Sequence, residues 1–250
     1  MERLRVLPIF EDYPNPTDFV GAVKKAVIHS HGEPLLIVFK DTTLGIDPIS
    51  RDKIKDAVRE ISAMLPSETH VFFGAMEKFG KGKFSNTGYI VSPRKEGKPS
   101  WKAYSKLWVK GSKSGKIFLT GDEWHAIESI SGEGIEARAK NVLARAKRWI
   151  RGRESKHMGH MQEITVRGKK VRFMLCNDFD SVDARKRKAD LLVVSSGGIE
   201  VKALDRRLGI IPARTSVVFA NTSSGSPMIV RKEQGKRKKR KTRSWKIRRV

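Results

Sequence analysis

A single cysteine is the residue of this chain best suited to nucleophilic chemistry. Cys176 directly follows the apolar run VRFML (171–175) and precedes Asn-Asp-Phe. Such a run is typical of a buried strand, and a thiol at the end of a buried strand is well placed to attack a substrate. The thiol would need a base, because only a few per cent of free cysteine is thiolate at neutral pH. The alternative reading is a small core residue, the usual role of a lone buried cysteine.

Six segments, taken in chain order, place Cys176 in a wider pattern. They are PLLIVFKD (34–41), VFFGAMEKFGKGKFSNTGYIVSP (71–93), WKAYSKLW (101–108), VRFMLCNDF (171–179), ADLLVVSS (189–196) and ARTSVVFANTSSGSP (213–227). In this order they resemble the nitrilase, or carbon–nitrogen hydrolase, superfamily over roughly residues 4 to 230. The second segment is similar to that family's paired strands with an Asn-Thr step, and the fourth to its nucleophile elbow.

The resemblance implies roles for individual residues. Cys176 matches the nucleophile, and Lys106 matches the lysine that stabilises the tetrahedral intermediate. Asp41 stands where the family places its glutamate base, and the backbone N–H of Asn177 would help to hold the oxyanion. Glu123, in GDEWHAI, is the best match for the family's second glutamate.

The implied reaction is attack on a small amide or nitrile, a thioester intermediate, and release by water or another acceptor. The resemblance implies no cofactor. Two residues depart from the family pattern: Asp41 is one methylene shorter than glutamate, and Lys40 replaces the proline that usually precedes the base. A loss of about 1 Å of reach can cost about a hundredfold in rate. A catalytically weakened domain is therefore a further alternative.

A rival interpretation rests on ADLLVVSSGGIEVKA (189–203). Asp190, followed by Glu200 and Lys202, fits the pattern of PD-(D/E)xK nucleases, in which an aspartate on one strand is followed by Glu-x-Lys on the next strand of a hairpin. In that reading the two carboxylates would bind Mg²⁺, and the lysine would orient water or stabilise charge. A nuclease would also explain the positive charge of the chain.

The charge is concentrated at the end of the sequence. The net charge is +25, and residues 231–250 hold twelve basic residues and one acidic residue, a net charge of +11. Such a run could neutralise phosphates non-specifically while Trp245 stacks on a base. The candidate nucleic-acid contacts are Lys236, Arg237, Lys238, Lys239, Arg240, Lys241 and Arg243. The alternative is a solvated, disordered extension.

Apolar patterning outlines the elements that would position these residues. Short apolar runs predict strands at 4–10, 34–39, 70–76, 86–92, 116–120, 191–194, 216–220 and 226–230. Residues 164–166 and 171–175, on either side of Gly168, predict a hairpin. Helices are expected from a cap at Thr17 or Asp18, from Asp47-Pro48 to Leu65, and over 135–151.

Together these features predict a mixed α/β protein with a four-layer α-β-β-α sandwich of the nitrilase type over residues 1–230, followed by a disordered basic tail at 231–250. One cysteine excludes an intramolecular disulfide. No run reaches the roughly 18 apolar residues of a membrane span, so we expect a soluble, cytoplasmic protein. The expected partners are a small amide or nitrile and, through the tail, nucleic acid; a homodimer is compatible with the resemblance.

Overall fold

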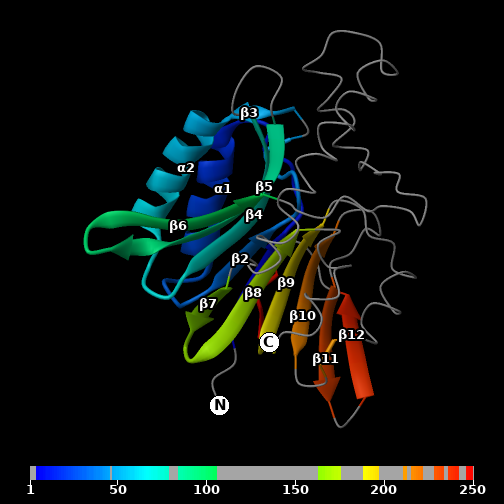
Figure 1. The fold of residues 1–250 in the computed structure, drawn as a ribbon. Coiled ribbons are helices and arrows are strands. Elements are labelled where there is room, and N and C mark those ends of the chain that lie inside the picture. Colours follow the sequence, from blue (N-terminus) through cyan, green and yellow to red (C-terminus); the bar gives the residue numbers. More distant parts are fainter. Residues whose placement is uncertain are drawn as a thin grey trace, which may run out of the picture.

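The computed structural model contains two β-sheets packed face to face, with two helices on the outer side of the first sheet (Figure 1). It describes residues 4–45, 47–78, 84–105, 163–175, 188–196, 211–212, 215–221, 228–233, 236–241 and 246–249. The predicted strand at 116–120 and the predicted helix at 135–151 lie outside these residues. The mixed α/β class expected from the sequence is confirmed.

The first sheet has the strand order β13-β1-β2-β4-β5-β6, with β3 paired to β4 beside this path. Strands β1, β2 and β4 run parallel, and β5 and β6 continue antiparallel from β4. The strands are β1 (Arg5–Ile9), β2 (Leu36–Phe39), β3 (Ile49–Ser50), β4 (His70–Lys78), β5 (Phe84–Lys95), β6 (Lys98–Ser105) and β13 (Arg248–Arg249). Apolar patterning missed β6, because Lys and Ser interrupt the apolar residues of its sequence KPSWKAYS.

The second sheet has the order β12-β11-β10-β9-β8-β7, with β8, β9 and β10 parallel. Its strands are β7 (Glu163–Val166), β8 (Lys169–Leu175), β9 (Leu191–Ser196), β10 (Ser216–Asn221), β11 (Met228–Glu233) and β12 (Lys236–Lys241). The predicted hairpin is confirmed: β7 and β8 pair antiparallel across Arg167 and Gly168. Both residues have positive φ, as the favoured two-residue hairpin turns require.

Two helices cover the first sheet. Helix α1 (Pro16–His29) is capped by Asn15, whose side chain accepts hydrogen bonds from the backbone N–H groups of Thr17 and Asp18. The cap expected at Thr17 or Asp18 is therefore wrong, because Pro16 already occupies the first helical turn. Helix α2 (Arg51–Met64) begins after Ser50 and not at Asp47-Pro48, because Ile49 and Ser50 pair with β4 as strand β3.

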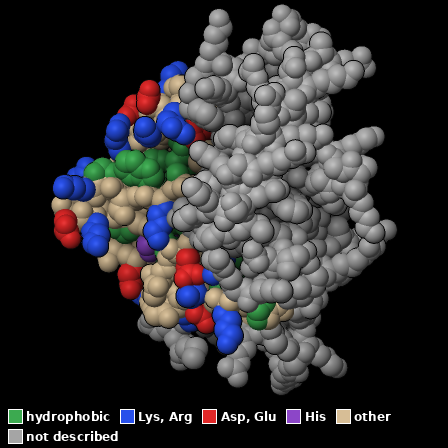
Figure 2. All heavy atoms as spheres, in the orientation of Figure 1, with side chains coloured by type: hydrophobic (Ala, Val, Ile, Leu, Met, Phe, Trp, Pro, Cys, Tyr) green, Lys and Arg blue, Asp and Glu red, His purple; other side chains and the backbone are tan. Residues whose placement is uncertain are grey.

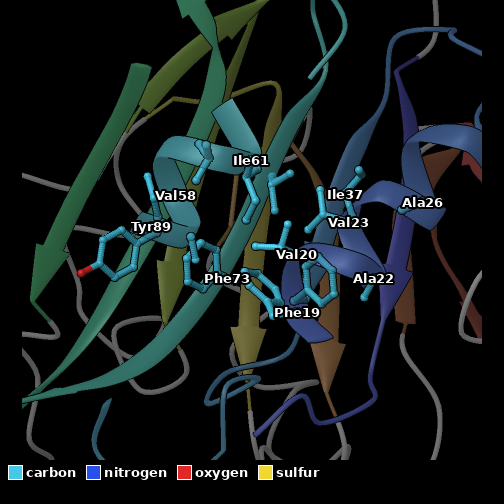
Figure 3. Close-up of a cluster of buried hydrophobic side chains, with 14 of the residues drawn as sticks. Phe19, Val20, Ala22, Val23, Ala26, Ile37, Val58, Ile61, Phe73 and Tyr89 are labelled. Atoms are coloured by element: carbon cyan, nitrogen blue, oxygen red, sulfur yellow. The ribbon is translucent and has the colours of Figure 1, made fainter. Parts of the chain in front are cut away.

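Two apolar cores separate the layers. The first lies between the helices and the first sheet, where Phe19 of α1 and Ile61 of α2 meet Phe73 and Tyr89 of the sheet (Figure 3). The second lies between the sheets, where Phe72 packs against Phe173 with ring centroids 5.4 Å apart. These elements form three layers, α-β-β. The described residues do not include the fourth layer that we expected, so the four-layer sandwich stays a prediction.

The basic segment is not a disordered tail where the structure describes it. Lys236–Lys241 forms β12, which pairs with β11, and Arg248–Arg249 forms β13, which pairs with β1. The expectation of disorder is therefore wrong for both stretches. Lysine-rich sequence disfavours strands locally, but pairing with an existing sheet edge decides the conformation here.

Neither of the two described helices is both long and apolar enough to cross a membrane.

Candidate active site

The carboxylate predicted as a base lies at the carboxyl end of β2. Asp41 is 3% exposed and follows Phe39 and Lys40, whose backbone N–H donates to the Ile9 carbonyl of the neighbouring strand. Its Oδ1 accepts a hydrogen bond from the backbone N–H of Thr42 at 3.0 Å. Its Oδ2 accepts one from Nδ2 of Asn86, on β5, at 3.3 Å. Two donors thus fix the orientation of a buried carboxylate.

The turn after Asp41 is held in an unusual backbone conformation. Thr42 has a φ of 56°, which is uncommon for a β-branched residue. Its hydroxyl donates to the Asp41 carbonyl at 2.7 Å, and its own carbonyl accepts from the Gly45 N–H at 2.9 Å. The N–H of Tyr13 donates to the Thr43 carbonyl at 2.7 Å. Strained backbone that is secured in this way is common at functional sites.

Lys40, one of the two departures from the family pattern, forms a local ion pair. Its ammonium group contacts the carboxylate of Asp12, and its side chain is only 11% exposed. Lys40 therefore neutralises a carboxylate of the loop after β1, and its charge has a partner other than Asp41.

Gly74 of β4 lies beside both the Asp41 carboxylate and the end of β8. A Cβ atom at this position would lie 2.4 Å from Oδ1 of Asp41 and 2.8 Å from Cδ2 of Leu175. Both distances are too short for a side chain, so glycine is required for this close approach. Leu175 ends β8 and is the residue directly before Cys176. The strand that leads to the predicted nucleophile therefore ends beside Asp41.

Strand β6 ends at the same level of the first sheet. Its last residue, Ser105, is in register with Thr87 of β5, which is itself in register with Ala75 of β4. Ala75 is the neighbour of Gly74. Lys106 is the next residue after Ser105. The strand that precedes the predicted lysine thus ends at the same level of the first sheet as Gly74, two strands away from it.

A hydrogen bond joins the two sheets at this end. The hydroxyl of Ser195, near the end of β9, donates to the backbone carbonyl of Phe39 at 2.7 Å, and both residues are buried. The carboxyl ends of the parallel strands β2, β8 and β9 therefore meet at one end of the sandwich. In α/β sheets, ligands bind outside the carboxyl ends of the strands.

Of the residues predicted for the hydrolase site, the structure describes Asp41. Lys106, Glu123, Cys176 and Asn177 lie outside the described residues, as does Arg243 among the predicted nucleic-acid contacts. Sequence reasoning missed Asn86 and Gly74 as neighbours of Asp41. A glycine inside the apolar run VFFGAM was the available signal for a close backbone approach.

The hairpin expected for a PD-(D/E)xK nuclease is wrong. Asp190 directly precedes β9, and both lateral neighbours of β9 are the parallel strands β8 and β10. Neither edge of β9 is available to a following antiparallel strand carrying Glu200 and Lys202, which are themselves outside the described residues. The Asp190 carboxylate accepts a hydrogen bond from the backbone N–H of Lys170 at 2.8 Å, a structural contact. Within the described ranges, no group of three or more His, Cys, Asp or Glu side chains could hold a metal ion.

A buried charged cluster lies on the helix side of the first sheet. Glu77 of β4 is 2% exposed, forms an ion pair with Nε of Arg51, and accepts a hydrogen bond from the Thr87 hydroxyl at 2.8 Å. Burial and the negative charge of Glu77 raise the pKa of Tyr89. Glu77 faces away from Asp41, because Gly74 and Met76 carry the inter-sheet face of the strand. The cluster therefore anchors the start of α2.

No family model matches the sequence, and no curated protein does. Solved structures do match. One is a cysteine-to-alanine variant of an amidase of the nitrilase superfamily from Nesterenkonia AN1: it is 12% identical, the match covers 100% of this chain and 91% of that chain, and the TM-score is 0.60. A crystal structure of an amidase from Nesterenkonia sp. is 14% identical over 94% of this chain and 85% of that chain, with a TM-score of 0.57.

The chain therefore has the fold of the nitrilase-superfamily amidases, as the resemblance predicted.

Proposed function

We propose that the chain is a carbon–nitrogen hydrolase that cleaves small amides or nitriles through a thioester on Cys176. The observation that carries this proposal is the contact at Gly74, where the Asp41 carboxylate and the side chain of Leu175 approach the same backbone atom. Cys176 is one residue further along the chain. A carboxylate and a thiol at neighbouring strand ends are the pair that nucleophilic catalysis by cysteine needs.

In the first half of the proposed reaction, the Asp41 carboxylate removes the thiol proton of Cys176 as the sulfur attacks the amide carbon. The carbonyl π electrons move to oxygen, and the oxyanion is stabilised by the Lys106 ammonium group and the backbone N–H of Asn177. When the intermediate collapses, the carbon–nitrogen bond breaks. Asp41 returns its proton to the nitrogen, which leaves as ammonia or an amine.

In the second half, a water molecule attacks the thioester. Asp41 accepts one proton from the water, the carbon–sulfur bond breaks, and the carboxylic acid leaves as the proton returns to the sulfur of Cys176. Glu123 would assist as the second carboxylate of the site. The cycle consumes one amide and one water and needs no cofactor.

The proposal accounts for the shorter side chain of Asp41 through two features of its surroundings, Gly74 and Asn86. At Gly74, Oδ1 of Asp41 and Cδ2 of Leu175 both approach the position that a Cβ atom would occupy, and in our proposal this close packing compensates for the missing methylene. The hydrogen bond from Asn86 holds the carboxylate in one orientation. In our proposal, a carboxylate fixed in one orientation needs less reach to meet a thiol that directly follows Leu175 in the sequence.

The solved structures with this fold support a small-amide substrate. One shows the acetamide moiety of fluoroacetamide added covalently to the active-site cysteine in a glutamate-to-leucine variant of the Nesterenkonia amidase, and another holds a cysteine-to-alanine variant of that amidase in complex with butyramide. We transfer this substrate class to the present chain as part of the proposal.

The test is ammonia release from a panel of short aliphatic amides, together with mass spectrometry after incubation with fluoroacetamide. The wild-type chain should release ammonia and gain one adduct, and Cys176→Ala should do neither. Cys176 is the only cysteine, so a thiol adduct has only one site. Asp41→Asn should lower turnover by about 10²–10⁴-fold, the usual contribution of a general base.

Asp56→Asn is the matched control, because it removes an exposed carboxylate of α2 that pairs with Arg59. It should leave turnover unchanged. Ammonia release that persists in Cys176→Ala, or a wild-type chain that neither releases ammonia nor forms the adduct, would overturn the proposal.

A further inference from the structure

The basic residues of the C-terminal segment occupy the edges of both sheets. Residues 236–249 hold ten basic and no acidic residues. Strand β12 is the edge strand of the second sheet, and β13 is the edge strand of the first. All six residues of β12 are Lys or Arg.

Both edges lie on the same side of the sandwich. Only residues 242–245 separate β12 from the described residues that lead into β13. A chain advances at most about 3.5 Å per residue, so this link spans no more than about 18 Å. Packed sheets lie about 10 Å apart, so the link is just long enough to pass from one sheet to the other on one side. The positive charge is thus concentrated along a single side.

The strand pairing places like charges opposite one another. Arg231 is in register with Lys238, and Lys232 with Arg237. At the other edge, Arg5 of β1 is in register with Arg249, but the Arg5 guanidinium already forms an ion pair with Glu33, so the opposed like charges lie between β11 and β12. Directly opposed like charges destabilise a sheet. A negatively charged ligand along this side would remove that repulsion.

The helix-covered face of the molecule is different. Figure 2 shows Lys and Arg side chains there interspersed with Asp and Glu, around a strip of hydrophobic side chains. Ion pairs such as Arg59 with Asp56 contribute to this balance. The concentrated positive charge therefore belongs to the β12–β13 side and does not extend to the helix-covered face.

We propose that the β12–β13 side binds the phosphate backbone of double-stranded nucleic acid. Strand β12 is about 20 Å long and carries six positive charges. A DNA duplex carries one negative charge per about 1.7 Å, hence about twelve over the same length. A strand spaces its residues at a fixed interval along the sheet edge, so the contact proposed here differs from that of a disordered tail. This inference is independent of the hydrolase chemistry.

The test measures the affinity for a mixed-sequence DNA duplex of about 30 base pairs by fluorescence anisotropy, at salt concentrations from about 50 to 200 mM. The test variant carries Arg237→Gln, Lys239→Gln and Lys241→Gln. If these residues contact three phosphates, the slope of log affinity against log salt becomes shallower by about 2–3. Affinity at the lower salt concentration should fall at least about tenfold.

The matched control removes three exposed lysines from the helices, through Lys24→Gln, Lys25→Gln and Lys53→Gln. Its net charge equals that of the test variant, and its salt slope should remain that of the wild type. A second variant, with Lys238→Arg, Lys239→Arg and Lys241→Arg, conserves the charge and should keep the wild-type slope. These two variants separate the position of the charge from its total amount.

Hydrogen exchange on the wild-type chain makes the test independent of any variant. DNA should slow amide exchange in β11 and β12 and leave exchange in α1 and α2 unchanged. The proposal is overturned by equal slopes in the test variant and the wild type, by an equal loss in the control, or by protection confined to the helices. Tighter binding to single strands or to phosphatidylserine vesicles would also overturn it.

Discussion

Gly74 is the position where a single methyl group would disturb the candidate site most directly. Its missing side chain leaves room for Oδ1 of Asp41 and for Leu175. Gly74→Ala should displace the carboxylate by about 1 Å, lower turnover by about a hundredfold and destabilise the fold by about 1–3 kcal/mol. Ammonia release and urea denaturation measure the two effects.

Gly21→Ala is the control for that substitution. Gly21 lies inside α1, and a Cβ atom there would meet nothing within 4 Å. Alanine should stabilise this helix by up to about 1 kcal/mol and leave turnover unchanged. A Gly74→Ala chain with normal turnover would contradict the close packing described for Asp41.

His70 makes stability depend on pH. Burial lowers its pKa from 6.5 to about 4, and Nδ1 lies 3.0 Å from the Ser92 hydroxyl. Between these values the unfolded chain binds a proton that the folded chain does not, so stability falls as the pH drops from about 6.5 to about 4. The loss attributable to His70 should be about 1–3 kcal/mol.

Urea denaturation at pH 7.5 and pH 4.5 measures this loss. His70→Gln should show a smaller difference between the two pH values than the wild type does. His29→Gln, at an exposed position in the last turn of α1, should show the wild-type difference. An equal pH dependence in His70→Gln and the wild type would show that His70 does not carry the effect.

At the residue scale, sequence reasoning located Asp41 correctly as a residue at the end of a buried strand. It could not find Asn86 as the partner of Asp41, because the contact joins residues 45 positions apart and depends on the register between β4 and β5. Register is set by the pairing of whole strands, and local composition does not encode it.

At the scale of elements, the charged cluster around Glu77 fixes the start of α2 to the sheet. Arg51 is the first residue of the helix, and its hydrogen bond to Glu77 raises the pKa of Arg51. Arg51→Gln would leave a buried carboxylate without its cation and should destabilise the fold by about 2 kcal/mol. This is below the 3–5 kcal/mol of a fully buried pair, because Arg51 is half exposed.

A double-variant cycle by urea denaturation tests this coupling. Adding Glu77→Gln to Arg51→Gln should restore much of the lost stability, because the uncompensated charge is removed. The exposed pair Arg59–Asp56 supplies the control, since Arg59→Gln should change stability by less than about 1 kcal/mol. If the changes in unfolding free energy of Arg51→Gln and Glu77→Gln simply add in the double variant, the two side chains are not coupled and the described cluster is contradicted.

Most strands could be predicted because their apolar runs are buried between layers. Strand β6 and the start of α2 could not. Trp101 and Tyr104 contact different cores from opposite faces of β6, so the strand has few apolar residues on either face. The Asp47-Pro48 signal was a good local helix start, but Ile49 and Ser50 pair with β4 and delay the helix. Tertiary pairing overrode local preference in both cases.

At the scale of the whole molecule, the C-terminal strands make the basic segment part of the fold. Deleting residues 236–250 removes β12 and β13 and exposes the edges of β11 and β1. A loss of about 2 kcal/mol would lower the Tm by about 4–8 °C in a chain of this size. Differential scanning calorimetry measures the change.

A disordered tail would give a different result, because its deletion would leave the Tm unchanged. The triple Gln variant of β12 is the control: it keeps the backbone pairing, removes the like-charged pair Lys232–Arg237 and should melt within about 2 °C of the wild type. For the same reason, substitution tests nucleic-acid binding more cleanly than deletion does.

The hydrogen bond from Ser195 to Phe39 has a consequence for how the chain folds. It joins residues 156 positions apart, at the place where the ends of β2 and β9 meet. Closing so long a loop is slow, because its entropy must be lost before the contact forms. Strands β1 to β6 and the two helices can form from pairings within residues 4–105, whereas the candidate site requires both sheets to dock. We therefore expect enzymatic activity to recover later than secondary structure during refolding, because this end of the sandwich forms last.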